Sequence, residues 1–179
     1  CALHGFVNVP RDADGMVRRL PLILGFEYRN PLDNSVHRHF VPSFALLSVL
    51  EHWGLSSDRV KVDFGHSITI RRDKAGSVRI PIDRHGRLFL NYTGRICDFK
   101  TISLLHFLRY GQHAVAHETG RQELTGARLE AIDRIRSLVE GNVAMIGLTA
   151  AGTTDIGPCP VDAQTPYVHV HMTAASNIL

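Results

Sequence analysis

A short apolar run near the C-terminal end of the chain is the feature that most constrains its fold. Residues 143–148 read Val-Ala-Met-Ile-Gly-Leu, a run too short for a typical helix and apolar enough for a buried strand. Small residues follow at 149–155, and a second apolar stretch begins at Tyr167. In α/β domains, ligand crevices form where a buried strand ends in such a loop. The run therefore predicts an α/β domain with a ligand crevice beside residue 149.

Length and charge narrow the class of protein. The 179 residues are 44% hydrophobic and 21% charged, which is enough apolar chain for one sizeable core. The 20 lysines and arginines are interspersed with 17 acidic residues, so the net charge of +3 gives no support for a nucleic-acid partner. No apolar run approaches the roughly 18 residues that a membrane span needs.

The first half of the chain predicts strands, one hairpin and one helix. A short strand is expected at 4–9 and a turn at 11–15, where Asp and Gly supply side-chain caps and positive φ. A long strand is expected at 16–26, and Pro21 within it indicates an edge position or a bulge. Two further segments, 27–29 and 36–40, flank turn residues and predict a hairpin.

A helix is expected between Pro42 and Gly54, because proline suits a first helical turn and glycine suits a left-handed cap. Apolar and polar residues then alternate repeatedly over 60–92, with glycine turns between the segments, which predicts a small antiparallel meander.

Two helices are expected before the apolar run. The first begins at Thr101 or Ser103 and ends at Gly111. A polar loop or a short helical excursion follows at 112–125, and a second amphipathic helix covers 127–140.

Together these elements predict an α/β fold, with α+β as the alternative: a mixed β-sheet flanked by helices, with an appended antiparallel β meander. No linker-like composition and no internal repeat interrupts the chain, so a single domain is predicted over residues 1–179.

The loop after the apolar run is the better candidate for a binding site. Small residues let backbone amides approach a ligand, and hydroxyls with one carboxylate can orient it. The polar residues expected near the crevice are Thr149, Thr153, Thr154, Asp155, Arg18 and Arg19. Ion pairing at a strand edge is an equally good account of the two arginines. The alternative for the loop is a plain strand connection, since it lacks the nucleotide-binding and nucleophile-elbow signatures. No catalytic residue and no cofactor is predicted.

Histidines and cysteines offer weaker signals. His169 and His171 lie two apart on an expected strand, so both rings would project to one face, and His37 and His39 share this spacing. His113 and His117 are one helical turn apart. A metal site needs three or four convergent ligands, and the sequence supplies only pairs, so no metal is predicted, with His169 and His171 as weak candidates. Cys97 and Cys159 could form one disulfide, or both could be idle thiols.

Several sequence blocks, in order along nearly the whole chain, resemble the CHASE2 family of sensory domains. They are His-Gly-Phe-Val-Asn, Asp-Ala-Asp-Gly-Met-Val-Arg-Arg-Leu-Pro-Leu, Pro-Ser-Phe-Ala-Leu, Gly-Arg-Leu-Phe-Leu-Asn-Tyr-Thr-Gly, Val-Ala-Met-Ile-Gly-Leu-Thr-Ala-Ala-Gly-Thr-Thr-Asp and Val-His-Val-His. The resemblance implies an extracytoplasmic sensor of a bacterial membrane receptor with a cyclase, histidine-kinase or serine/threonine-kinase output. It also implies that this chain is the later part of the domain, with an earlier segment and the membrane helices outside it.

Three functions follow as hypotheses. The first is a ligand-sensing ectodomain that binds an unknown small-molecule signal and is not itself an enzyme. The second is a metal-dependent α/β hydrolase that uses His169, His171 and Asp155. The third is a ligand-free dimerisation scaffold, in which the partner is a second copy of the chain.

Overall fold

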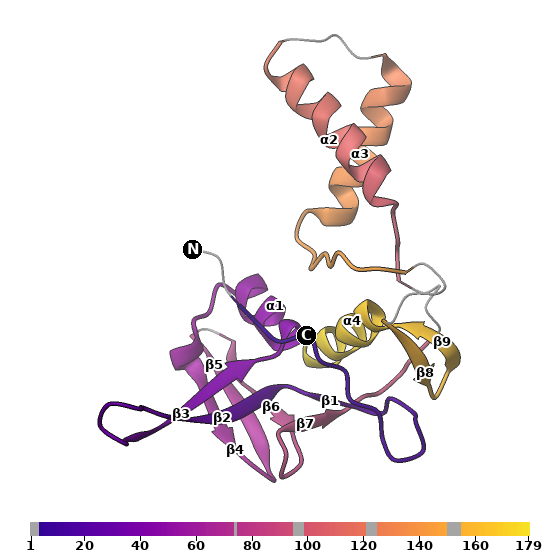
Figure 1. The fold of residues 1–179 in the computed structure, drawn as a ribbon. Helices are drawn as coiled ribbons and strands as arrows, with labels where there is room; N and C mark the ends of the chain where they lie inside the picture. Colours follow the sequence, from indigo (N-terminus) through magenta and orange to yellow (C-terminus); the bar gives the residue numbers. More distant parts are fainter. Residues whose placement is uncertain (1–3, 74, 95–98, 121–124, 150–154) are drawn as a thin grey trace. The chain divides into compact units, whose positions relative to one another are not determined.

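The structure is a computed structural model that describes residues 4–73, 75–94, 99–120, 125–149 and 155–179 (Figure 1). Its contacts divide the chain into two compact units, residues 1–95 with 147–179, and residues 96–146. The single domain predicted over residues 1–179 is not tested by this division and stays a prediction. Each unit is described by itself below.

The first unit opens with a turn and a broken strand. The turn expected at 11–15 is confirmed: the Gly15 N–H donates to the Asp12 carbonyl at 2.8 Å, with Gly15 at φ +84°. The long strand expected at 16–26 is divided into β1 (Arg19–Pro21) and β2 (Ile23–Arg29). Between them Leu22 donates to the Gly86 carbonyl and accepts from the Ser43 N–H, so its backbone leaves the ladder just after Pro21.

The strand expected at 4–9 is wrong. Only Phe6 makes a β-bridge, in the parallel sense, with Ser43. Pro10 closes this segment and lacks a backbone N–H, and no continuous ladder extends the bridge within the described residues.

The expected hairpin is confirmed and extends further than predicted. Strand β2 pairs in antiparallel register with β3 (Val36–Pro42), from Ile23 opposite Pro42 to Arg29 opposite Val36. Nearly all of both strands is solvent-exposed, including Phe26 and Phe40.

The predicted first helix is confirmed as α1 (Phe44–His52). Its first turn is capped by Ser43, whose hydroxyl accepts a hydrogen bond from the Leu46 N–H at 3.2 Å. Gly54 follows the helix with φ +64°, a conformation that glycine adopts without a steric penalty. Pro42 and Gly54 therefore flank the helix as predicted, although Pro42 is the last residue of β3 and not part of the first helical turn.

The predicted meander is confirmed as β4 (Val60–Asp63), β5 (Ser67–Arg72) and β6 (Gly76–Pro81), after a short 3-10 turn η1 (Ser57–Arg59). Alternation gives it a buried face that includes Ile68, Ile70 and Ile80. The next strand, β7 (Arg87–Phe89), leaves the meander and pairs antiparallel with β1.

The last part of the chain departs most from the prediction. The apolar run at 143–148 is irregular, with Ile146 71% and Leu148 61% exposed, so the expected buried strand is wrong. A strand needs a neighbour to satisfy its backbone, and no described residue pairs with this segment. At Gly147 the backbone instead passes so close to Val168 that a Cβ would overlap its side chain.

The remaining elements are β8 (Ile156–Cys159), β9 (Asp162–Pro166) and α4 (Tyr167–Ile178), of which β8 and β9 form a hairpin. The strand expected around His169 and His171 is wrong, because the helix begins directly after Pro166. Helices α4 and α1 pack against each other and lie on the same side of β1–β7 (Figure 1). Their shared core contains the buried residues Leu46, Val49, Val170 and Ala174.

The second unit is a helical hairpin of α2 (Leu104–Glu118) and α3 (Gly126–Val139). Helix α3 confirms the second predicted helix, but the predicted stop at Gly111 is wrong. A glycine inside a helix costs only about 1 kcal/mol relative to alanine, which Ala114, Val115 and Ala116 offset by continuing the helix. An apolar hollow of about 490 Å³ lies between the two helices.

The predicted fold class is confirmed as mixed α and β, with helices beside several small antiparallel sheets. Among the described residues the strands form four separate small sheets, β1–β7, β2–β3, β4–β5–β6 and β8–β9, instead of one continuous mixed sheet. Every named strand pair is antiparallel.

Two glycines test how closely the turns are packed. Gly86 and Gly15 both have positive φ, but a Cβ at Gly86 would lie 2.8 Å from the Ile23 carbonyl oxygen, whereas a Cβ at Gly15 would meet nothing within 4 Å. We expect Gly15→Ala to lower the free energy of unfolding by about 1 kcal/mol, and Gly86→Ala by about 2–4 kcal/mol, because only the second must also displace backbone. Urea unfolding measures both, and equal costs would contradict the expectation.

Candidate arginine-lined binding site

Strand pairing brings two distant arginines to one face of a small sheet. In the β1–β7 ladder Arg19 lies opposite Phe89, and Pro21 lies opposite Arg87. Because alternate residues share a face, Arg19 and Arg87 are diagonal neighbours on the outer side. The residues between them, Leu20 and Leu88, point into the core and are buried. The apolar alternation that anchors these strands thus fixes where both arginines emerge.

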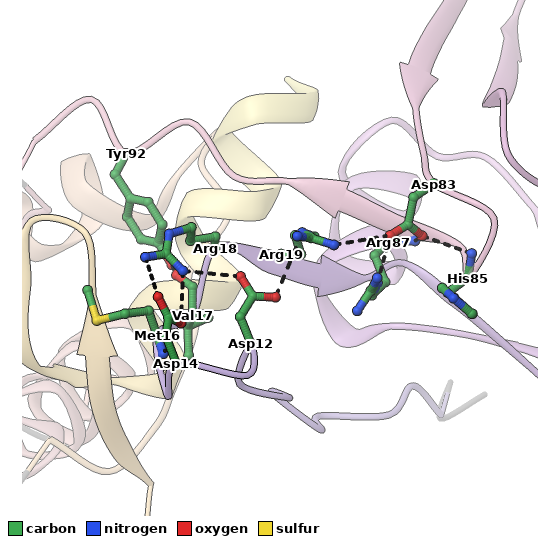
Figure 2. A network of polar contacts seen from close by, with 10 residues as sticks. All are labelled: Asp12, Asp14, Met16, Val17, Arg18, Arg19, Asp83, His85, Arg87 and Tyr92. Atoms are coloured by element: carbon green, nitrogen blue, oxygen red, sulfur yellow. Dashed lines mark hydrogen bonds and ion pairs between the residues drawn. The ribbon is translucent and has the colours of Figure 1, made fainter.

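The turn before β1 supplies two carboxylates. Arg18 grips Asp14 with both terminal nitrogens, Nη1 to Oδ1 at 3.0 Å and Nη2 to Oδ2 at 2.8 Å (Figure 2). Asp12 lies between the two consecutive arginines, with one oxygen 3.5 Å from Arg18 Nη1 and the other 3.7 Å from Arg19 Nε. This pattern confirms that Arg18 and Arg19 form ion pairs at a strand edge.

The turn before β7 is organised around Asp83. Its carboxylate accepts the backbone N–H groups of His85 at 2.9 Å and Arg87 at 3.0 Å, and the Arg87 Nε at 2.7 Å. Its Oδ2 also lies 3.9 Å from Arg19 Nη1. Figure 2 shows Arg19 between the Asp12 and Asp83 carboxylates.

These contacts shift the pKa values of the carboxyl groups. Hydrogen bonds from Arg18, and then from the Met16 N–H, lower the pKa of Asp14 to about 2, and the same pairing raises the pKa of Arg18. Partial burial would raise the pKa of Asp83, but the hydrogen bonds from Arg87 and His85 outweigh it and hold that pKa below its usual value. These carboxylates therefore remain negatively charged at neutral pH.

A fourth arginine, Arg11, connects this region to the C-terminal helix. Arg11 Nε donates to the Tyr167 hydroxyl at 2.8 Å, and its Nη2 donates to the Ile156 carbonyl at 3.1 Å. Tyr167 is the first residue of α4, and its own N–H donates to the Asp155 carbonyl at 2.8 Å. Arg11 thus connects the turn at 11–15 with the start of both β8 and α4.

The surface at this point is hollowed, with a volume of about 500 Å³. We call it the basic hollow and define it by its lining residues, which are Arg11, Asp12, Ala13, Asp14, Arg18, Arg19 and Arg87. Four cations face two carboxylates in this lining, so the basic hollow carries a positive balance.

The predicted site residues are brought together only in part. Arg18 and Arg19 line the basic hollow, whereas Thr149 and Asp155 are exposed residues that do not. Thr153 and Thr154 lie outside the described residues. Arg11 and Arg87 also line the hollow and were not predicted from sequence. Arg87 could not be placed beside Arg19 from sequence, since their pairing joins strands far apart in the chain.

The histidine and cysteine candidates take other places. His169 and His171 are both buried on α4, where residues two apart point to different sides of a helix, so they do not share a face as predicted. His113 and His117 do lie one turn apart, on α2. No group of three or more metal-ligating side chains occurs among the described residues. Cys159 is a buried free thiol, and Cys97 lies outside the described residues.

A comparison with protein-family models settles the family. The model of the CHASE2 domain matches residues 2–179. The chain belongs to the CHASE2 domain family. CHASE2 domains are sensory and non-catalytic, which confirms the resemblance seen in the sequence and agrees with a domain that is not itself an enzyme. No curated protein and no solved structure matches this CHASE2 domain.

The Asp83 turn can be tested by mutation. Asp83→Ala removes the acceptor of two backbone N–H groups and of Arg87 Nε, so we expect the free energy of unfolding to fall by about 1–3 kcal/mol. Asp63→Ala is the matched control, because its side chain is 65% exposed and lies 3.5 Å from one histidine nitrogen. Urea unfolding that shows equal losses for the two variants would rule out the organising role of Asp83.

Proposed function

We propose that this CHASE2 domain is the extracytoplasmic, ligand-sensing part of a bacterial transmembrane receptor with a cyclase or kinase output. Membership of a sensory domain family over residues 2–179 is the observation that carries the proposal. CHASE domains are generally extracellular, which supports the location. Within the described residues, no helix has the length and apolar character needed to cross a membrane.

We further propose that the signal binds near Arg18 and Arg19, and we keep Thr149, Thr153, Thr154 and Asp155 as candidates for further contacts to it. Two features support the arginine side: a hollow large enough for a small metabolite, and donors oriented by the β1–β7 ladder. Arg11 supports a link to the loop, because it bonds to Ile156 directly after Asp155. A ligand signals by binding one of two receptor states more tightly than the other.

The location is tested by protease accessibility of the parent receptor in intact spheroplasts. Added protease is expected to cleave within the CHASE2 domain while a cytoplasmic control protein stays intact. Protection of the domain until the membrane is permeabilised would overturn the proposed location.

The sensory role is tested with the parent receptor reconstituted in vesicles. Cyclase or kinase output is measured while metabolite fractions are added on the side of the CHASE2 domain. We expect at least one fraction to change the output, and the change to vanish when residues 1–179 are replaced by an unrelated folded domain. An identical response after this replacement would contradict the proposal.

A further inference from the structure

The most informative group in the basic hollow is Arg19, because its donors are the least used. A guanidinium carries five N–H donors. The nearest carboxylate oxygens lie 3.7 Å from Nε and 3.9 Å from Nη1, beyond hydrogen-bond distance. Among the described residues, Arg19 makes no side-chain hydrogen bond, although its side chain is only 39% exposed. Arg19 is therefore a partly desolvated cation that lies near two carboxylates, and its guanidinium N–H donors remain available to a ligand.

The neighbouring arginines are arranged differently. Arg18 spends both terminal nitrogens on Asp14, and Arg87 spends Nε on Asp83. Arg11 uses Nε and Nη2 on Tyr167 and Ile156. These three side chains are thus held by protein partners, and they line the same hollow as Arg19. A guanidinium with unused N–H donors, in a hollow lined by other arginines, suits the binding of an oxyanion.

The charge balance limits which oxyanion fits. The four arginines of the lining outnumber its carboxylates, and even with Asp83 included the count is four cations to three anions. A ligand with one or two negative charges is favoured over a polyanion, which Asp12 and Asp14 would repel. The volume of about 500 Å³ suits a small metabolite.

We infer that the basic hollow binds a small metabolite through a carboxylate or phosphate group held by the Arg19 guanidinium. This inference rests on the proposed function and names the chemical class of its signal. Arg19 exchanges its long contacts with Asp12 and Asp83 for two short hydrogen bonds to the ligand, while Arg18, Arg87 and Arg11 keep their protein partners.

The test is calorimetric titration of the chain with inorganic phosphate and, separately, with succinate, at ionic strength held constant with sodium chloride. We expect saturable binding of at least one probe, and roughly tenfold or greater weakening in Arg19→Gln. Arg38→Gln is the matched control, since Arg38 is an exposed, ion-paired arginine of β3 outside the hollow, and it should bind as the wild type does. Binding of phosphate alone or succinate alone identifies the group recognised.

Arg19→Lys keeps the charge and loses the fork, and it serves if the glutamine variant does not fold. Intermediate affinity is expected for it. Absence of saturable binding of both probes, or equal binding by the wild type and the Arg19 variants, overturns the inference.

These outcomes are distinguishable from failure of the proposed function. If the receptor responds to an uncharged compound equally with and without Arg19→Gln, the sensory role stands and oxyanion binding by Arg19 is wrong. A receptor whose output ignores the CHASE2 domain removes the sensory role, whatever the titration shows.

Discussion

Replacing Leu46 with alanine is expected to lower the free energy of unfolding by about 2–5 kcal/mol. Leu46 is 1% exposed on α1, the helix that packs against α4. Alanine is a better helix former than leucine, so the loss reports the cavity and the missing apolar contacts instead of a weaker helix. The loss is a large part of the 5–15 kcal/mol that stabilises an ordinary domain.

Leu32→Ala is the control for this prediction, because Leu32 is the same residue type at 94% exposure in the β2–β3 loop. We expect its effect to stay within about 0.5 kcal/mol. Chemical unfolding followed by far-UV circular dichroism measures both variants. A Leu46→Ala loss below 1 kcal/mol would show that α1 does not pack as described.

The stability of the chain is expected to fall as the pH drops below about 6.5, the ordinary pKa of histidine. His169 and His171 are both buried on α4, and burial lowers the pKa of each. Nε2 of His171 donates to the Val7 carbonyl at 3.2 Å, while its buried Nδ1 has no hydrogen-bond partner among the described residues. Protonation of His171 in the folded state would therefore bury a charge whose Nδ1–H has no acceptor among the described residues.

The sign follows from proton uptake. Below the unfolded-state pKa the unfolded chain binds protons that the folded chain excludes, so the free energy of unfolding decreases with falling pH until the lowered folded-state pKa is reached. Each histidine contributes a slope of at most about 1.4 kcal/mol per pH unit. Above pH 7.5 both contributions are constant.

The variant His171→Gln checks the assignment, because glutamine retains a donor for the Val7 carbonyl but does not titrate. We expect it to reduce the slope of unfolding free energy between pH 6.5 and 5. The control His106→Gln, at an exposed position of α2, is expected to keep the wild-type slope. If His171→Gln keeps it too, burial of His171 does not contribute to acid sensitivity.

Local chemistry explains which elements were predictable from sequence. Helix α1 was placed by Pro42 and Gly54, and the meander by strict alternation and its glycine turns. These signals act between neighbours in the chain, so no tertiary information was needed. Helix α4 was misread around His169 because its valines favour strands locally, whereas its buried face against α1 decides for a helix.

The apolar run at 143–148 is a second segment for which a strand was predicted and none forms. Its composition suits a buried strand, yet a strand forms only where a neighbouring backbone is available, and composition does not reveal that neighbour. The site shows the same limit. Arg18 and Arg19, which were predicted near a ligand crevice, line the basic hollow, but Arg87 reaches it only through the β1–β7 pairing, which no local pattern encodes.

The two turns whose carboxylates flank Arg19 differ in how tightly they are packed. In the turn that carries Asp83, Gly86 lies against the Ile23 carbonyl and the carboxylate accepts three hydrogen bonds. In the turn at 11–15, Gly15 has open space around it. A ligand that draws Arg19 away from Asp12 would therefore act on one tightly packed turn and on one turn with open space around it. The turn at 11–15 is attached through Arg11 to Tyr167, so its movement would be passed to the first turn of α4.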